Sequence, residues 1–301
     1  MSIKKTGGKW DRTRWPCYIP AVTMIGWPQV CYDLLDQMLV PINQLDDQML
    51  PKFEELVNQC PTMLDSGVFN LTQVHAERHK ISMDQALQIA PEEIDNFEPL
   101  FDRYCRITKQ FGKKLWGYVE IDQGGRENKI KIRARLEKQG IVPIPVYHPL
   151  NDGWDYFDYL AQQYDRICFG NVVQANAEVR QRLIATAWER RRKYPHLWIH
   201  ALGLTASELT VAYPINSCDS STWSGSVRWG RQRSFVSTSP FGDMGESFVY
   251  EYGSQDSYVK SIRVSAYEVR LNSRQMRIIA EDQRKALGAD IGMFNVAAGK
   301  N

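Results

Sequence analysis

The order of the apolar runs constrains the fold of this 301-residue chain more than any other feature. Runs of strand length and composition occur near residues 18, 62, 115, 142, 166, 197 and 214, and segments with helical spacing separate most of them. This alternation favours a parallel sheet. We therefore expect an α/β fold, a (β/α)8 barrel whose eighth strand comes from residues 234–237 or 248–252. A doubly wound open sheet is the competing architecture, but no G-x-G-x-x-G motif follows the first run.

The domain organisation follows from this pattern. Residues 1–301 are expected to form a single barrel-type catalytic domain, with a helical insertion at residues 70–112 and a C-terminal extension at residues 240–301. With 43% hydrophobic residues, the chain can bury a core of that size.

Helical spacing predicts several connecting helices. We expect helices over residues 32–39 and 52–58, a capping box at Ser82-x-x-Gln85, and a longer helix from Pro91 to Phe111 with a kink at Pro99. Further helices are predicted over 126–139, 152–165 and 179–188.

Composition excludes some function classes. A net charge of +2 gives no global field that would indicate a strongly charged partner. No apolar run reaches membrane-spanning length, and the first residues lack the apolar core of a signal peptide, so we expect a cytosolic protein without a membrane partner. The cysteines are scattered without any C-x-C or C-x-x-C pair, which argues against both a zinc site and a disulfide framework.

The stretch from His196 to Gly225 is the best candidate for chemistry. An apolar run ends at Gly203, a Thr205-x-x-Glu208 capping box opens a short helix, and a second run leads to Asp219. Polar residues at the C-terminal end of a strand are how a barrel presents its active site. In isolation, Asp-Ser-Ser-Thr is more typical of a turn, but the run at residues 62–69 also ends in Asp-Ser-Gly.

Three carboxylates each follow a predicted strand, namely Asp65, Asp122 and Asp219. In a barrel they would converge on the C-terminal mouth. A pair of carboxylates suits nucleophilic displacement at a sugar carbon, because one attacks the anomeric carbon while the other moves protons.

Several segments between about residues 60 and 230 resemble, in the same order, motifs of the tRNA-guanine transglycosylases. They are Leu64-Asp65-Ser66-Gly67-Val68-Phe69, Val119-Glu120-Ile121-Asp122, Phe169-Gly170-Asn171-Val172, the stretch His200 to Leu209, and Asn216-Ser217-Cys218-Asp219-Ser220. The chain departs from that family in lacking its zinc site, and Tyr147-His148-Pro149 replaces the usual Gln-Gly. Asp219 followed by Ser-Ser-Thr-Trp instead resembles the DpdA-type DNA-guanine transglycosylases, which are often phage-encoded.

The resemblance implies exchange of guanine in DNA for a 7-deazaguanine such as preQ0, with neither ATP nor a redox cofactor. It gives Asp219 the role of nucleophile and Asp65 that of proton acceptor. The implied base-binding residues are Asp122, Ser66, Gly67, Gly170, Asn171, Gly203 and His148. Gly170 and Asn171 would offer backbone donors, and a target base in duplex DNA would have to be flipped. Tyr147 and Trp223 are candidates for stacking on the base.

Basic segments are candidates for phosphate contacts. We prefer Arg228, Arg231 and Arg233, because they directly follow the nucleophile strand. The stretch 126–138 and the set Lys260, Arg263, Arg270, Arg274 and Arg277 are further candidates. The run 190–193 fits better as charge at a helix C-terminus.

His75 and His79 have the i, i+4 spacing of metal ligands, but the sequence shows no third ligand, so we interpret them as surface or substrate-loop residues and expect no metal.

Other functions stay open at this stage. The same chemistry could act on tRNA, because a fold resemblance does not choose the polymer. A non-catalytic barrel that binds nucleic acid or an active partner is ranked lower, because Asp219 is present. A glycoside hydrolase is a third alternative, although no Glu-based acid pair is apparent at strand ends. A homodimer is allowed for.

Overall fold

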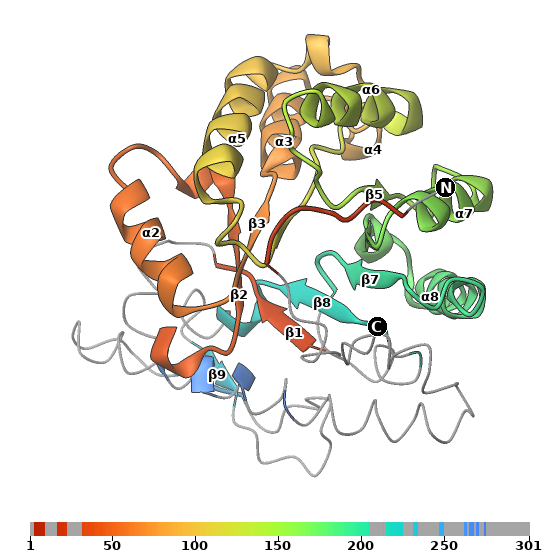
Figure 1. Cartoon of the computed structure of the whole chain (residues 1–301). Coiled ribbons are helices and arrows are strands. Elements are labelled where there is room, and N and C mark those ends of the chain that lie inside the picture. The colour runs from red at the N-terminus through yellow and green to blue at the C-terminus, as the bar shows by residue number, and fades with distance from the viewer. Residues whose placement is uncertain are drawn as a thin grey trace.

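The chain is an α/β fold built on parallel sheets (Figure 1). The structure is a computed structural model that describes residues 3–9, 17–22, 32–204, 213, 215–224, 231–233, 247–249, 262–263, 265–267, 269–270 and 274. Among the helices of these residues, none combines the length and the apolar character that crossing a membrane requires.

Eight of the strands pair in parallel. They are β1 Cys17–Pro20, β2 Met38–Pro41, β3 Thr62–Asp65, β4 Gly117–Tyr118, β5 Val146–Tyr147, β6 Arg166–Phe169, β7 Trp198–Ala201 and β8 Ser217–Ser220. One sheet has the order β1-β8-β7-β6-β5 and another the order β2-β3-β4. A separate antiparallel pair joins β9 Arg231–Arg233 to β10 Ser247–Val249.

The two parallel sheets are linked at both edges. A parallel bridge joins Ala21, after β1, to Leu39 of β2, and Val22 donates a backbone hydrogen bond of 2.8 Å to the same Leu39. At the other edge, Val119 bridges to Ile144, and the Ile144 amide donates to the Tyr118 carbonyl at 2.8 Å. Each edge strand of the smaller sheet therefore has a neighbour in the larger one.

Helices connect most of the strands. They are α2 Leu50–Gln59, α3 Val68–His79, α4 Met83–Ala86, α5 Phe97–Phe111, α6 Gly125–Glu137, α7 Trp154–Gln163 and α8 Ala177–Arg191, with 3₁₀ turns η2 Tyr32–Leu34, η3 Ile42–Gln44, η4 Pro91–Glu93, η5 Val172–Gln174 and η6 Thr222–Ser224. Local sequence sets several of their ends. The predicted capping box of Ser82 and Gln85 opens α4, and Asn176 caps α8 through a 2.9 Å bond from the Val179 amide.

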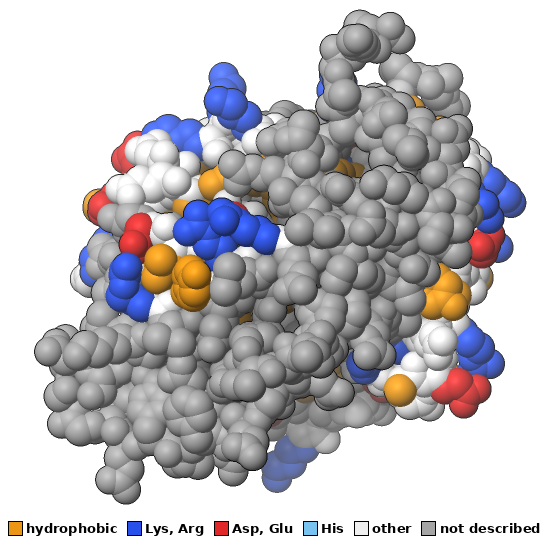
Figure 2. Space-filling view, turned by 90° about the horizontal axis from the view of Figure 1, so that it is seen from below, with side chains coloured by type: hydrophobic (Ala, Val, Ile, Leu, Met, Phe, Trp, Pro, Cys, Tyr) orange, Lys and Arg blue, Asp and Glu red, His pale blue; other side chains and the backbone are white. Residues whose placement is uncertain are grey.

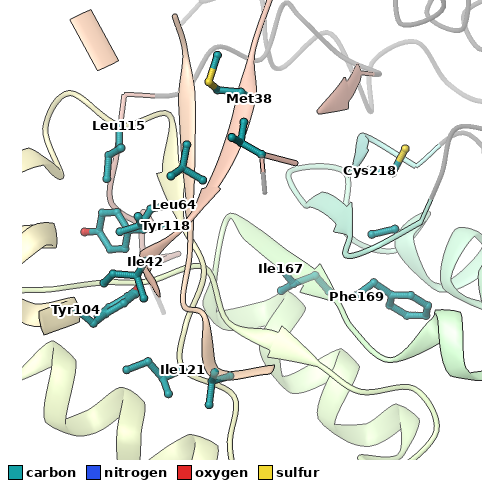
Figure 3. Close-up of a cluster of buried hydrophobic side chains, with 14 of the residues drawn as sticks. Met38, Ile42, Leu64, Tyr104, Leu115, Tyr118, Ile121, Ile167, Phe169 and Cys218 are labelled. Atoms are coloured by element: carbon teal, nitrogen blue, oxygen red, sulfur yellow. The ribbon is translucent and has the colours of Figure 1, made fainter. Parts of the chain in front are cut away.

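The strands bury both of their faces. One set of buried side chains, which we call the strand cluster, lies on one face of the strands. Its members in strands come from β1, β2, β3, β5, β6 and β7, and the others flank β4 and β5. They are Ile19, Leu39, Met63, Trp116, Val119, Ile144, Val146, Cys168 and Trp198. The alternate side chains point toward the helices, as period-2 strands require. On that side, Tyr104 of α5 lies beside Tyr118 and Leu64 (Figure 3), with the two tyrosine rings 6.4 Å apart. Such burial on both faces is typical of parallel sheets covered by helices.

The assignment of the eighth strand was wrong. Residues 38–41 form β2, not the helix predicted over 32–39. A short apolar run ended by a proline fits either element, and here pairing with β3 decides it. Of the segments predicted to close the sheet, 234–237 lies outside the described residues, and Ser247–Val249 pairs antiparallel with β9 instead.

The helix predicted from Pro91 to Phe111 is also divided differently. Residues 91–93 form η4, and α5 begins only at Phe97. Pro99 is therefore in the first turn of α5, where a missing amide hydrogen costs no helical bond, rather than at an internal kink.

Candidate active site

Asp65 ends strand β3, Asp219 is the last but one residue of β8, and Asp122 follows the end of β4 by four residues. Burial, together with the charges of Asp219 and Asp122, raises the pKa of Asp65 to about 7. The backbone hydrogen bonds that Asp65 accepts from Gly67 and Ser66 oppose the rise. The charges of Asp219 and Asp122 thus act on Asp65, and the convergence of all three at one barrel mouth stays a prediction.

Asp219 is buried and held by two donors. His200 Nε2 lies 3.0 Å from Asp219 Oδ1, and the Gly203 amide donates to the same oxygen at 3.1 Å. Asp219 Oδ2 accepts no hydrogen bond from the described residues. Gly203 has a φ of +68°, a left-handed conformation that favours glycine and turns its amide back toward β8. Gly203 was predicted to contact the base, and here it contacts the carboxylate.

A buried chain of polar groups stands behind Asp219. His200 Nδ1 lies 2.8 Å from Ser217 Oγ, and Trp198 Nε1 donates to that same Oγ at 2.9 Å. Because the Ser217 hydroxyl already accepts from Trp198, its own hydrogen is available for His200 Nδ1. A neutral His200 would then carry its proton on Nε2, which faces Asp219.

The sequence interpretation missed the roles of His200 and Ser217. The available signal is strand periodicity: His200 is two residues from Trp198 on β7, and Ser217 is two residues from Asp219 on β8. Side chains two residues apart share a face of a strand, so Ser217 lies on the same face of β8 as Asp219, and His200 on the same face of β7 as Trp198.

The turn that carries Asp65 depends on glycine. Gly67 has a φ of +72°, and its amide donates to Asp65 Oδ2 at 3.1 Å. A Cβ at Gly67 would lie 1.7 Å from Asn43 Oδ1, so a larger residue would strain the backbone and force the Asn43 side chain to move. Ser66 is buried, and its Oγ accepts a long bond of 3.5 Å from the Val68 amide. Ser66 and Gly67 thus shape the turn from which Asp65 projects, and α3 starts directly after it.

Asp122 pairs with His148, a contact that was not predicted from the sequence. His148 Nε2 lies 2.8 Å from Asp122 Oδ2. Burial would raise the pKa of Asp122, but the hydrogen bond and charge of His148, together with the charge of Lys129, hold it below its usual value. Among the described residues, none donates a side-chain hydrogen bond to Asp122 Oδ1, so this oxygen can accept one from a ligand.

The expected role of Gly170 was wrong. Its amide donates to the Tyr147 carbonyl at 2.9 Å, so sheet pairing uses the donor that was assigned to the base. Gly170 instead makes room: a Cβ there would lie 2.8 Å from His148 Cδ2 and 2.9 Å from Val146 Cγ1. Asn171 has a φ of +48°, and its side chain donates to Asn151 Oδ1 at 2.7 Å.

Two buried ion pairs support the His148 loop. Lys129 of α6 pairs with Asp152, whose carboxylate also accepts from the His148 amide at 2.7 Å. Arg133 of α6 forms a two-pronged pair with Glu120 at 2.6 and 3.0 Å. Removing one partner of such a pair would leave a buried charge without compensation.

Tyr147 was wrongly considered for stacking on a base. It is fully buried, with ring centroids of Trp154, Phe157 and Phe169 each 5.5 Å away, so it belongs to the core. Trp223 is half-buried and donates from Nε1 to the Ala21 carbonyl at 2.9 Å.

Several of the candidate basic residues are paired with acids. On α6, Lys129 and Arg133 are buried in ion pairs, so they are not available for phosphates. Arg126 and Arg135 of the stretch 126–138 pair with Asp155 and Glu98 at the surface, and its exposed Lys131 and Lys138 stay candidates. Arg263 pairs with Asp33, and Arg270 and Arg274 pair with Asp36. Figure 2 shows described Lys and Arg side chains in separate groups on one face of the molecule, some of them beside Asp or Glu.

The preferred phosphate contacts stay predictions. Arg228 lies outside the described residues, as do Lys260, Arg277 and the helix predicted at Thr205. Arg231 and Arg233 are placed only as the ends of β9, through their backbone pairing with β10.

Comparison with known proteins gives no family. No family model and no curated protein matches the chain. A solved structure from Aquifex aeolicus VF5 matches with a TM-score of 0.46 and 9% sequence identity, over 86% of this chain and 94% of that chain. A likeness at that level carries no argument about function, which therefore has to be argued from the site.

Proposed function

We propose that this chain is a base-exchange transglycosylase that replaces guanine in DNA with a 7-deazaguanine, through a covalent bond to Asp219. The observation that carries the proposal is the group of three carboxylates, in which Asp65 has a pKa of about 7 because it is buried beside Asp219 and Asp122. A reaction that shuttles one proton at neutral pH needs a group of that kind.

The proposal includes a closed (β/α)8 barrel. Its support is the pair of bridges, Ala21 with Leu39 and Val119 with Ile144, which connect both edges of the two parallel sheets. The strand cluster also draws on both sheets, as the packed interior of such a barrel does. In a barrel, the ends of β3, β4 and β8 face the same mouth.

The proposed first step is attack by Asp219 on C1′ of the target nucleotide. Its Oδ1 is held by His200 and Gly203, so Oδ2 is the oxygen that forms the new C–O bond. The C1′–N9 bond breaks, and its electron pair goes to guanine, which takes the proton of Asp65. The products are free guanine, ionised Asp65 and a glycosyl ester of Asp219.

The second step reverses the first with a different base. A 7-deazaguanine gives the proton on its attacking nitrogen to Asp65 and displaces Asp219 from C1′. Asp65 ends protonated and Asp219 ionised, so the enzyme returns to its starting state. No oxidant, reductant or nucleotide triphosphate enters this balance.

Asp122 is proposed to recognise the base edge. Guanine and the 7-deazaguanines share N–H donors on that edge, and an ionised carboxylate is an acceptor for them. His148 occupies Oδ2 of Asp122, which leaves Oδ1 to accept from the base. The His148 ring in turn needs the space that Gly170 provides.

DNA is the proposed polymer because of the resemblance of Asp219-Ser-Ser-Thr-Trp223 to the DNA-acting branch. The base would have to leave the duplex stack to reach a buried carboxylate. Single-stranded or mismatched DNA should therefore react faster than perfect duplex.

Mass spectrometry of nucleosides tests the proposal. DNA and tRNA are each incubated with the protein and 7-deazaguanine bases, and incorporation is measured. We expect incorporation into DNA, and none with Asp219→Asn, which keeps the size of the side chain but not its charge. Incorporation into tRNA alone would disprove the DNA assignment. Incorporation into neither polymer would disprove the exchange reaction. Full activity of the Asp219→Asn variant would disprove the role of Asp219.

A further inference from the structure

In the segment between β3 and β4, helix α3 and the turn before α5 bring three metal-binding groups together. His75 and His79 lie on the last turns of α3, and Asp95 lies between η4 and α5. Their ligand atoms all lie within 4.8 Å of one another. Among the described residues, no other set of three His, Cys, Asp or Glu side chains meets that condition.

The distances fit a first-row divalent ion. Asp95 Oδ2 lies 3.6 Å from His75 Nδ1 and 3.5 Å from His79 Nε2. Zinc bonds of about 2.0–2.1 Å to histidine and carboxylate place ligand atoms roughly 3.3 Å apart in a tetrahedral site. Only small movements of the exposed His79 and half-exposed Asp95 would complete that geometry.

The contacts of His75 leave room for an ion. His75 Nδ1 is buried and lies 3.6 Å from Asp95 Oδ2, beyond hydrogen-bond length. Among the described residues, the only hydrogen bond to this nitrogen is a long one of 3.4 Å from the Asp95 amide. A metal ion at Nδ1 would take the place of that weak bond, because an imidazole nitrogen has a single lone pair.

Arg78 currently supplies positive charge at this point. Its guanidinium lies 2.6 Å from Asp95 Oδ2, the same oxygen that faces both imidazoles. Arg78 is 58% exposed, so its side chain can move into solvent when another cation arrives. Arg78 would therefore compete with a metal ion for the Asp95 carboxylate.

We propose that His75, His79 and Asp95 bind one divalent transition-metal ion of the zinc class, with one or more coordination positions left for water. Two imidazoles and one carboxylate are a donor set that such ions prefer over Mg²⁺ or Ca²⁺. The ion would tie the end of α3 to the start of α5. At its other end, α3 begins directly after the Gly67 turn that follows Asp65. This inference revises the expectation of no metal, and it does not depend on the proposed base exchange.

Cobalt titration of the full chain, freed of metal with a chelator, tests the site. We expect one equivalent of Co²⁺ to give visible ligand-field absorption that Zn²⁺ displaces. His79→Gln and Asp95→Asn should each weaken binding at least ~10-fold, since loss of an outer-shell partner alone usually costs 10–100-fold. Arg78→Gln should bind as tightly as the unaltered chain or more tightly, because it removes the competing charge.

Thermal unfolding provides a second readout. Zn²⁺ should raise the Tm of the unaltered chain and of Arg78→Gln, but not that of His79→Gln or Asp95→Asn. Asp155→Asn is a matched control, because Asp155 is an exposed acid paired with an arginine, Arg126, outside this cluster. It should leave Co²⁺ binding unchanged. Absence of binding by the unaltered chain, or equal binding by His79→Gln and Asp95→Asn, would overturn the proposal. Weaker binding by Arg78→Gln would show that Arg78 is not a competitor, which would equally overturn it.

Discussion

His200 Nε2 lies 3.0 Å from Asp219 Oδ1 across neighbouring parallel strands, and the two side chains are almost completely buried. The other ring nitrogen lies 2.8 Å from Ser217 Oγ, which also accepts from Trp198. This chain of contacts fixes the orientation of the imidazole, and a hydrogen on Nε2 would then hold one oxygen of Asp219 in place. A nucleophile gains from such fixation, because attack requires a narrow range of distances and angles.

His200→Leu should lower kcat by about 10²-fold, the cost expected when a reacting group is misplaced by about 1 Å. KM for the base should change little, because His200 contacts Ser217 and Asp219 and not Asp122 or His148, which are proposed to bind the base. His200→Gln should recover part of the rate, since its amide can still donate to Asp219. Single-turnover formation of the covalent intermediate is the measurement. Equal rates for the Leu and Gln variants would show that His200 acts only through packing.

Asp65 should make the two half-reactions respond to pH in opposite ways. Its pKa is about 7, because of burial and the neighbouring charges of Asp219 and Asp122. Release of guanine needs protonated Asp65, so its rate should fall about tenfold per pH unit above 7. Capture of the incoming base needs ionised Asp65, so that rate should rise with pH and level off above 7. Rapid-quench measurement of each half-reaction between pH 5 and 9 checks this, and Asp65→Asn should remove both dependences.

The same carboxyl group should affect stability. Its pKa in the folded chain, about 7, exceeds the usual value of 3.8, so the folded state binds the proton more tightly. Stability should therefore fall as pH rises from about 4 to about 7. Asp65→Asn should be more stable than the unaltered chain at pH 8, by on the order of a few kcal/mol, and the difference should vanish near pH 3. Urea unfolding at several pH values measures it. A constant difference would contradict the raised pKa.

Gly170→Ala should displace the His148 ring, because the new Cβ would lie 2.8 Å from His148 Cδ2. Overpacking of this kind costs about 1–3 kcal/mol of stability. Loss of the contact between His148 and Asp122 should also raise KM for the base more than it lowers kcat. In the double variant with His148→Ala, the stability cost of Gly170→Ala should shrink, because the clashing ring is gone. Additive costs in urea unfolding would contradict this explanation.

Most of the α/β pattern could be predicted from the sequence, because runs such as 62–65 and 166–169 are apolar and clearly bounded. The strand at 38–41 could not be recognised, since its four residues are too few to show a period and only pairing with β3 defines it.

In the candidate site too, only the local features could be predicted from the sequence. Asp65, Asp122 and Asp219 were predicted as strand-end carboxylates, a local property of the sequence. The space between Gly170 and His148 and the approach of Asp95 to His75 depend on tertiary packing, which no local pattern contains.

The last prediction concerns the polymer and the arginines that follow the Asp219 strand. Arg228, Arg231 and Arg233 come directly after Asp219-Ser-Ser-Thr-Trp223, so we expect them to neutralise phosphates near the site. Replacing Arg228 and Arg233 with Ala should weaken binding to all DNA sequences alike and reduce the salt slope of log K by about 1 for each lost contact. The choice of base should not change. Arg135→Ala is a control, because Arg135 pairs with Glu98 on the protein surface. Fluorescence anisotropy with single-stranded DNA at several salt concentrations measures the slope. An unchanged slope in the double variant would exclude these arginines from the phosphate contacts and leave the chemistry of Asp219 unaffected.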